Sequence, residues 1–195
     1  PNHRPSAAPP STSLPRAPLV FLHFRAIDLP FIPMSTHLPA SLEVLIPSDA
    51  RIAIVAARFN DHIVQRLVDG CTSALHTAGL HKDHIVIERV PGAFEIPLAA
   101  QTLARTRRFD AVICLGCIIR GDTPHFEYIA AQCAAGIMRV GLDESLPVIF
   151  GVLTTETELQ AKQRTGEGHS HAGASAAGAA ADMIALIRRN KSSAN

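Results

Sequence analysis

Gly116-Cys117-Ile118-Ile119-Arg120-Gly121-Asp122-Thr123-Pro124-His125-Phe126-Glu127-Tyr128 is the stretch from which the fold can be worked out. It follows the apolar run 111–115 and leads into a segment whose apolar residues recur every three or four positions. This pattern predicts that a buried strand ends and a helix begins here. In open α/β sheets, ligands bind in the crevice beyond the carboxyl ends of the strands, so a site is expected at this stretch.

The residue types in this stretch suit a binding site, but they also suit an ordinary loop. Gly116 and Gly121 allow tight turns and close approach of the backbone to a ligand. Thr123 and Pro124 are typical of residues that begin a helix. His125, close to that start, carries an imidazole, which can move protons near neutral pH. The alternative is a strand-to-helix loop with a surface histidine, and the stretch alone leaves both open.

The rest of the chain repeats the order of strand, then helix. Short apolar runs predict four buried strands, at residues 52–57, 85–90, 110–115 and 147–153. Helical spacing predicts one helix between Asn60 and Gly79 and others at residues 98–106, 126–142, 156–164 and 173–189. Strands that alternate with helices predict an α/β fold, a three-layer α/β/α sandwich with a four-stranded parallel sheet.

Helix ends and helix faces are predicted as well. Asn60 or Asp61 is expected to cap the first helix, and Thr154 or Thr155 the fourth, with Glu158 completing a capping box after Thr155. Small residues from Ala174 to Ala181 are expected to let the last helix pack closely. The apolar residues expected to face the core are Ile63, Val64, Leu67, Val68, Cys71, Leu75, Leu98, Leu103, Ile129, Cys133, Ile137 and Met138.

Residues 1–42 differ from the rest of the chain. Residues 1–18 are rich in Pro, Ser and Ala, and prolines interrupt the short apolar patches that follow, so neither a regular helix nor a central strand is expected there. Met34 is a candidate start of translation, and a targeting peptide is the alternative interpretation. We predict a disordered extension at 1–42 and one domain at 43–195.

Composition excludes several classes of partner. The formal net charge is +1 and no basic stripe is interleaved with aromatic residues, so nucleic acid is not expected as a partner. No apolar run reaches the roughly 18 residues that span a bilayer, so no membrane partner is expected. Cys114 and Cys117 have the spacing of redox and zinc sites, but residues three apart on a strand face opposite ways. His169 and His171 are a weak metal signal, and no metal site is expected.

Three side chains near predicted strand ends or loops suit a flat, phosphorylated ligand. Phe59, after the first strand, is either a platform for a heterocycle or a residue at the edge of the core. Glu95 is placed either to read the polar edge of such a ring or to cap a helix. Arg164 suits a phosphate or a surface ion pair. The G-x-G-x-x-G, Walker and nucleophile-elbow motifs are missing, so nicotinamide or nucleoside-triphosphate chemistry is not expected.

Four motifs together resemble the 6,7-dimethyl-8-ribityllumazine synthase family: Ala57-Arg58-Phe59-Asn60, Val90-Pro91-Gly92-Ala93-Phe94-Glu95-Ile96-Pro97, Gly116 to Tyr128, and Phe150-Gly151-Val152-Leu153-Thr154. The resemblance implies a flavodoxin-like sheet. It also implies condensation of 5-amino-6-ribitylamino-2,4-pyrimidinedione with 3,4-dihydroxy-2-butanone 4-phosphate, with loss of phosphate and water, which is the penultimate step of riboflavin biosynthesis. The implied enzyme is a cytoplasmic transferase that needs no cofactor and no metal.

The resemblance assigns roles to individual residues. The catalytic residues are His125, for proton transfer, and Arg164, which binds the substrate phosphate from across a subunit interface. The residues that bind the pyrimidine substrate are Phe59, which stacks on its ring, and Ala93, Phe94, Glu95, Ile118, Ile119 and Phe150, the last from a neighbouring subunit. The residues that bind the butanone phosphate, besides Arg164, are Gly121, Asp122 and Thr123.

The chain departs from the family pattern near the expected phosphate. Many members carry a lysine and, three residues on, a glutamate near the start of the last helix, where this chain has Ala172 and Ser175. The sequence Gly168-His169-Ser170-His171 resembles the Gly-His-Asn-His of fungal members, so His171 is expected to take over the phosphate contact. Asp122 adds an acid close to the same phosphate.

The family also implies partners. Its members form pentamers that share active sites between subunits, and some assemble twelve pentamers into hollow icosahedral shells. The expected partners are therefore two small-molecule substrates, further copies of the chain in a pentamer or 60-mer, and riboflavin synthase. The N-terminal segment is a candidate strand for a neighbouring subunit's sheet.

Two other functions stay open at this point. A non-catalytic lumazine- or flavin-binding assembly protein on the same fold is motivated by the missing lysine and by Asp122. A flavodoxin-type electron carrier would purify yellow with bound FMN, and we predict that this protein does not. His125 and Arg164 favour the enzyme, because a protein that only binds needs no proton-transfer group beside a phosphate site.

Overall fold

A computed structural model describes residues 45–166 and 171–192, all of them within one compact unit that spans Ser35–Asn195. The predicted extension at 1–42, its boundary with the domain, and His169 lie outside the described residues. Among the described residues, no helix is long and apolar enough to cross a bilayer.

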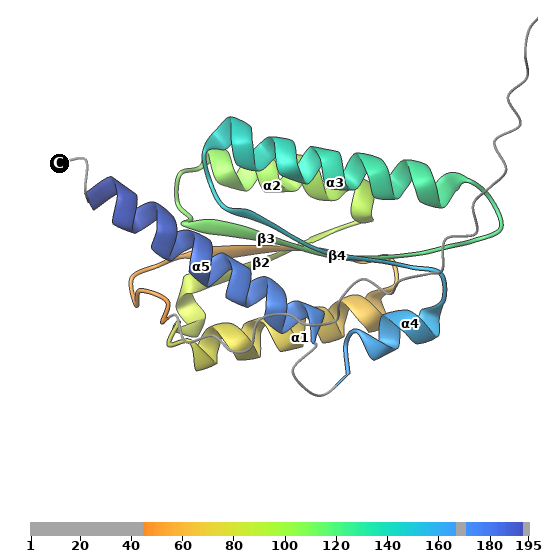
Figure 1. The fold of residues 1–195 in the computed structure, drawn as a ribbon, viewed down its shortest axis with the longest axis horizontal. Coiled ribbons are helices and arrows are strands. Elements are labelled where there is room, and N and C mark those ends of the chain that lie inside the picture. The colour runs from red at the N-terminus through yellow and green to blue at the C-terminus, as the bar shows by residue number, and fades with distance from the viewer. Residues whose placement is uncertain (1–44, 167–170, 193–195) are drawn as a thin grey trace, which may run out of the picture. The chain divides into compact units, whose positions relative to one another are not determined.

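The centre of the unit is a four-stranded parallel sheet, as the sequence predicts, and its strand order is β2-β1-β3-β4 (Figure 1). Its strands are β1 (Ile52–Ala57), β2 (Ile85–Val90), β3 (Ala111–Ile119) and β4 (Val148–Thr155). Neighbouring strands pair in parallel throughout. β1 and β3 are therefore central, and their continuous apolar sequences follow from burial on both faces.

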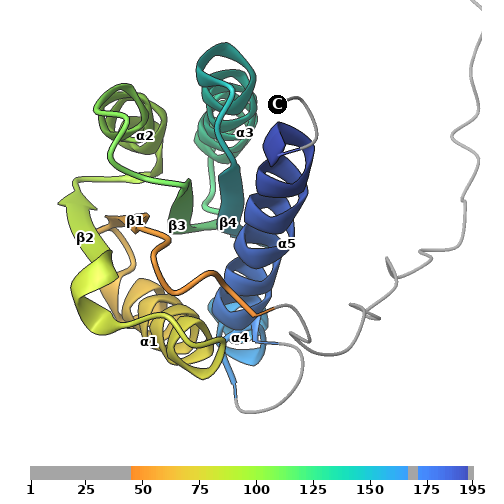
Figure 2. The same ribbon diagram turned by 90° about the vertical axis from the view of Figure 1, so that its left-hand side faces the viewer.

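Helices cover both faces of the sheet (Figure 2). One face carries α1 (Asp61–Thr77), α4 (Glu158–Gln163) and α5 (Ala172–Ser192), and the other carries α2 (Ile96–Arg105) and α3 (His125–Glu144). Short 3₁₀ turns, Lys82–His84 and Ala93–Glu95, precede β2 and α2. Ile52, Ile54 and Ala56 pack on the α1 and α5 side, whereas Ala53 and Val55 pack on the α2 and α3 side. This confirms the three-layer α/β/α prediction.

The cysteines confirm the prediction of structural thiols. Cys114 and Cys117 belong to the cores on opposite faces of the sheet, so they cannot form a redox pair. All four cysteines are free and buried. Burial raises the pKa of Cys71 to about 12 and the pKa of Cys117 to about 11, which leaves both as unreactive thiols near neutral pH.

The predictions for the end of β3 and for the cap of α4 are wrong. Gly116 was expected to begin a loop, but β3 continues to Ile119, because Gly116–Ile119 pair with Val152–Thr155 of β4. The cap of α4 is Thr157, not Thr154 or Thr155, and Gln160 rather than Glu158 completes the capping box. The hydroxyl of Thr157 accepts a hydrogen bond from the Gln160 amide at 3.2 Å.

Two apolar residues predicted to be buried are exposed. Leu98 on α2 is 70% exposed and Met138 on α3 is 69% exposed. These helices face the sheet through other positions of the same helical repeat, with Ile96, Ala100 and Ala104 on α2 and Cys133, Ile137 and Val140 on α3. The predicted burial of the α1 residues, Cys133 and Ile137 is confirmed. Leu103 and Ile129 are partly buried.

The small residues of α5 allow it to lie directly on α1, as predicted. Ala176, Ala177, Ala180 and Ala181 are buried. The contact is closest at Gly173, where an added Cβ would lie 2.1 Å from the carbonyl oxygen of Leu67. Because that oxygen belongs to the backbone of α1, it cannot move aside as a flexible side chain would.

Replacing Gly173 by alanine should therefore lower the free energy of unfolding by about 3 kcal/mol, the upper end of what overpacking usually costs. The measurement is urea denaturation at one fixed protein concentration. Gly166→Ala is the matched control, because its Cβ would meet other atoms only at 3.6 Å or beyond. Equal midpoints for the two variants would contradict the close contact.

Candidate active site

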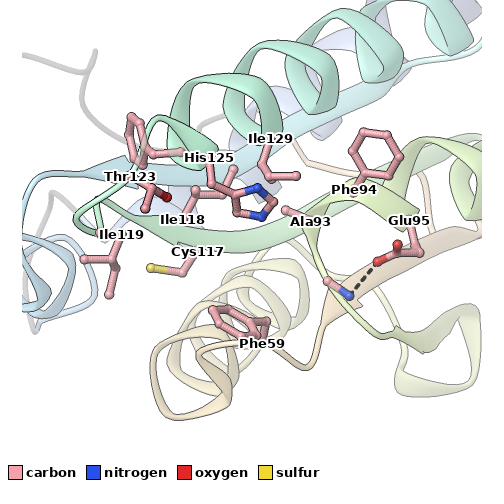
Figure 3. Close-up of a pocket in the computed structure, with 13 residues that line it drawn as sticks. Phe59, Ala93, Phe94, Glu95, Cys117, Ile118, Ile119, Thr123, His125 and Ile129 are labelled. Carbon is pink, nitrogen blue, oxygen red and sulfur yellow. Dashed lines mark hydrogen bonds between the residues drawn. The ribbon is translucent and has the colours of Figure 1, made fainter.

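A cleft of about 510 Å³ lies where β1 and β3 end. The chain leaves β1 for β2 on one side and returns to β3 on the other, so this is the point at which the strand order reverses. Such switch points are where open α/β sheets bind ligands. The residues that line the cleft are Phe59, Gly92, Ala93, Phe94, Glu95, Cys117, Ile118, Ile119, Gly121, Thr123, His125, Phe126 and Ile129 (Figure 3).

Two aromatic rings border this cleft and remain uncovered by their own chain. Phe59 is 70% exposed and Phe94 is 57% exposed. The turn that carries Phe59 is held against the end of β2, because the Arg58 amide donates to the Val90 carbonyl at 2.8 Å and the Phe59 amide donates to the Pro91 carbonyl at 3.1 Å. A fixed, exposed ring at an apolar cleft is a suitable surface for a flat heterocycle.

Glu95 acts within its own turn. Its Oε2 atom accepts a hydrogen bond from the Gly92 amide at 2.9 Å, which stabilises the 3₁₀ turn before α2 (Figure 3). The hydrogen bond agrees with the capping interpretation of Glu95. Glu95 also lines the cleft, and its contact with the polar edge of a ring stays a prediction. Ala93 and Phe94 of the same turn also line this space.

His125 is the first residue of α3 and enters the cleft from the side opposite the β1–α1 turn (Figure 3). The ring is exposed, and no described residue forms a hydrogen bond or an ion pair with it. Pro124 precedes the helix without a side-chain cap. The imidazole is therefore available to a ligand that occupies the cleft.

The segment between β3 and α3 is held by Arg120, a residue to which the sequence analysis assigned no role. Its guanidinium bonds Glu127 at 2.6 Å and Glu156 at 2.5 Å, and it lies 4.2 Å from the centre of the Phe126 ring. The Arg120 amide also donates to the Thr155 carbonyl. These contacts fix the position at which Gly121 and Thr123 line the cleft.

Four residues predicted to contribute to the site do not line the cleft of their own chain. Asp122 is exposed beside it, and Arg164 is an exposed residue at the end of α4. Phe150 lies on the edge strand β4 and is 45% exposed. Arg164 and Phe150 were expected to serve a neighbouring subunit, so their roles stay predictions.

His171 is the fourth, and it packs between α1 and α5. An atom at the Cβ position of Gly70 would overlap its ring, so the ring fills the notch that this glycine leaves. Its Nδ1 atom accepts a hydrogen bond from the Gly173 amide at 3.1 Å. This contact requires Nδ1 to be unprotonated. Through its contacts with Gly70 and Gly173, His171 is part of the interface between α1 and α5. A contact with the phosphate remains a prediction.

The burial of His171 predicts a loss of stability in acid. Burial lowers the pKa of His171, and Arg66 nearby adds to this while Asp69 opposes it. The unfolded chain then takes up a proton near pH 6.5 that the folded chain resists, so stability is complete above that pH and falls as the pH drops below it. Urea denaturation at pH 7.5 and 5.5 should show this fall, and His171→Gln should show less of it. An identical pH dependence in the variant would contradict the assignment.

The cleft contains no obvious metal centre. Among residues 45–166 and 171–192, no group of three or more His, Cys, Asp or Glu residues is arranged to hold a metal ion. Its lining is mostly apolar, with a few polar groups at the edge. Such a cleft suits a flat organic molecule that carries polar substituents.

Comparison with known proteins agrees with this chemistry. The sequence model of the 6,7-dimethyl-8-ribityllumazine synthase family matches residues 49–188. A 6,7-dimethyl-8-ribityllumazine synthase of Protochlamydia amoebophila (strain UWE25) is 49% identical over 139 residues, which is 71% of this chain and 81% of that protein. One of Syntrophus aciditrophicus (strain SB) is 48% identical over 145 residues, 74% of this chain and 94% of that protein.

Proposed function

The chain belongs to the 6,7-dimethyl-8-ribityllumazine synthase family, and we propose that it makes this lumazine in riboflavin biosynthesis. The substrates are 5-amino-6-ribitylamino-2,4-pyrimidinedione and 3,4-dihydroxy-2-butanone 4-phosphate, and phosphate and water are released. The observation that carries the proposal is the cleft itself, in which one apolar volume has an exposed aromatic ring at one wall and an exposed imidazole at the other.

The pyrimidine substrate is placed against Phe59. Its flat ring stacks on the exposed phenyl group, and the backbone of Ala93 and Phe94 meets its polar edge. Ile118 and Ile119 form the apolar wall beside it, and Phe150 of a neighbouring subunit completes the pocket. The location of Ala93, Phe94, Ile118 and Ile119 around one cleft supports this placement.

His125 transfers protons in the reaction. Imine formation between the amino group of the pyrimidine and the carbonyl group of the second substrate, phosphate elimination and ring closure all move protons, and an imidazole can both donate and accept them near neutral pH. The free ring of His125 at the cleft supports this role. Holding the two substrates side by side supplies a large part of the remaining rate.

Gly121, Asp122 and Thr123 are proposed to hold the butanone phosphate, together with Arg164 and His171. Arg164 of a neighbouring subunit binds the phosphate group, because its guanidinium matches phosphate oxygens. It also stabilises the negative charge on phosphate as it leaves. The exposure of Arg164, away from the cleft of its own chain, supports a role across an interface.

This division of the site requires a homo-oligomer, which we propose is a pentamer or a 60-mer. An exposed stripe on α3 supports it, with Tyr128, Ala131, Ala135, Met138 and Leu142 at alternating spacings of three and four residues. That spacing is typical of helices that pack against other helices. The particle mass from sedimentation would distinguish the two assemblies. The proposed location is the cytoplasm, and riboflavin synthase is the proposed further protein partner.

The test is to mix the full chain with both substrates and to follow the fluorescence of the lumazine. We expect turnover that requires the butanone phosphate. A metal chelator should leave this turnover unchanged. The unphosphorylated butanone is the control, because it cannot release phosphate. Tight binding of 6,7-dimethyl-8-ribityllumazine without any turnover would contradict the proposal and would identify a binding protein.

A further inference from the structure

Asn60 lies where the two central strands separate. The pairing of β1 with β3 ends at Ala56 and Leu115, whereas β3 continues beside β4 to Ile119. The central strands therefore part at their carboxyl ends, which opens the cleft. Asn60 lies four residues past Ala56, and its side chain crosses this gap, where its Nδ2 atom donates to the carbonyl oxygen of Cys117 at 2.9 Å.

The backbone at Asn60 is arranged for this contact. Asn60 adopts the left-handed conformation, with φ 58° and ψ 42°, which asparagine tolerates better than most residues. The sequence predicted that Asn60 or Asp61 would cap α1, and Asn60 does occupy the cap position. Its side chain, however, forms no capping hydrogen bond, because the amide points to β3. This cap prediction is therefore wrong as to what the side chain does.

The turn with Phe59 is consequently fixed on two sides. Its backbone amides donate hydrogen bonds to the Val90 and Pro91 carbonyls at the end of β2. The side-chain amide of Asn60 donates to the Cys117 carbonyl of β3. Cys117 is immediately followed by Ile118 and Ile119, which line the cleft. The Asn60 bond therefore joins the aromatic wall of the cleft to its aliphatic wall.

We propose that Asn60 is a positioning residue that sets the distance between Phe59 and the Ile118–Ile119 wall, and so the affinity for the flat ring of the pyrimidine substrate. This inference rests on the proposed function. Asn60 acts through Phe59 and Cys117 and need not touch the substrate. The butanone phosphate lies on the Gly121–His125 side, which this bond does not hold, so its binding should depend little on Asn60.

Asn60→Gly tests the amide alone, because glycine adopts the left-handed conformation without strain and no capping bond is lost. Loss of one hydrogen bond should raise KM for the pyrimidine substrate by about 10-fold. kcat, KM for the butanone phosphate and the thermal midpoint should stay close to the values of the unaltered chain. Asn60→Asp should have at least as large an effect, because a carboxylate cannot donate to the Cys117 carbonyl.

Ser145→Gly is the matched control, since Ser145 also has a left-handed backbone, with φ 50°, but ends α3 far from the cleft. An unchanged KM for the pyrimidine substrate in Asn60→Gly would overturn the proposal. Equal rises in both KM values together with a lower thermal midpoint would also overturn it, because they would indicate a general structural role.

The dissociation constant of 6,7-dimethyl-8-ribityllumazine, measured by its fluorescence, tests Asn60 separately from catalysis. It should rise by a similar factor in Asn60→Gly even if the unaltered chain proves not to turn over its substrates. An unaltered chain without turnover would refute the proposed function alone. If Asn60→Gly bound lumazine as tightly as the chain without the substitution, only the role of Asn60 would be refuted.

Discussion

Replacing His125 by alanine is expected to lower kcat by on the order of 10²-fold, which is the lower range of what general acid–base catalysis contributes. The imidazole lines the cleft and has no hydrogen-bond partner among the described residues, so it is free to exchange protons with the reacting groups. The loss should not be larger, because the placement of two substrates side by side does not depend on His125.

Two further variants make this test specific. His125→Gln keeps a polar side chain at the start of α3 but cannot transfer protons near neutral pH, so it should lose about as much activity as the alanine variant. His81→Ala is the control, because His81 is exposed before β2, at the opposite end of the sheet. A kcat for His125→Ala within twofold of the unaltered chain would remove His125 from proton transfer.

Replacing Arg164 by alanine is expected to lower kcat/KM for the butanone phosphate by on the order of 10²-fold. Hydrogen bonds to charged groups contribute about 1.5–3 kcal/mol, and each 1.4 kcal/mol corresponds to a factor of ten. KM for the pyrimidine substrate should change little. Arg164→Lys should recover part of the loss, since it keeps the charge but not the planar pair of donors.

Mixing the two inactive variants tests whether Arg164 serves a neighbouring subunit. In assemblies formed from equal amounts of His125→Ala and Arg164→Ala chains, about a quarter of the sites would combine an intact His125 with an intact Arg164 from next door. Activity should therefore return on joint refolding. Arg108→Ala, which alters an exposed arginine before β3, is the control for single variants. No recovery on mixing would place Arg164 and His125 in the same chain's site.

Local patterns in the sequence predicted the layers of this fold. Runs such as Ile52–Ala57 are apolar at every position because the strand is buried on both faces, and the alternation with helices fixes a parallel sheet. The end of β3 could not be predicted in this way. Gly116 suggested a turn, but its small size serves packing, since an added Cβ would lie 3.1 Å from Ile96 and 3.3 Å from Val152.

The sequence left open which side of α2 and of α3 packs against the sheet, for a related reason. Both helices carry apolar residues on two sides, and periodicity alone does not say which side meets the sheet. Leu98 and Met138 lie on the side that the chain itself leaves exposed. A second apolar side is what a subunit interface requires, so the same residues that misled the burial prediction support the proposed assembly.

The candidate site was predictable where its residues follow strand ends. Phe59, Ala93 to Glu95, Ile118 and His125 were each expected at the cleft, and all of them line it. The hydrogen bond of Asn60 with Cys117 and the ion pair of Arg120 with Glu156 were not foreseen, because the partners lie 57 and 36 residues apart in sequence. A single sequence gives no signal for such pairings, whereas a motif at a strand end has a place fixed by topology.

The packing of α5 on α1 delays completion of the fold until α5 has been synthesised. Gly173 of α5 lies directly against the Leu67 carbonyl of α1, and Arg188 of α5 pairs with Asp49 across 139 residues. At about 5–20 residues per second, a ribosome needs roughly 5–20 s to advance from α1 to α5. Until α5 docks, the face of β3 and β4 that it covers lacks its final cover. The nascent chain therefore offers a chaperone a defined surface, which α5 removes as it docks.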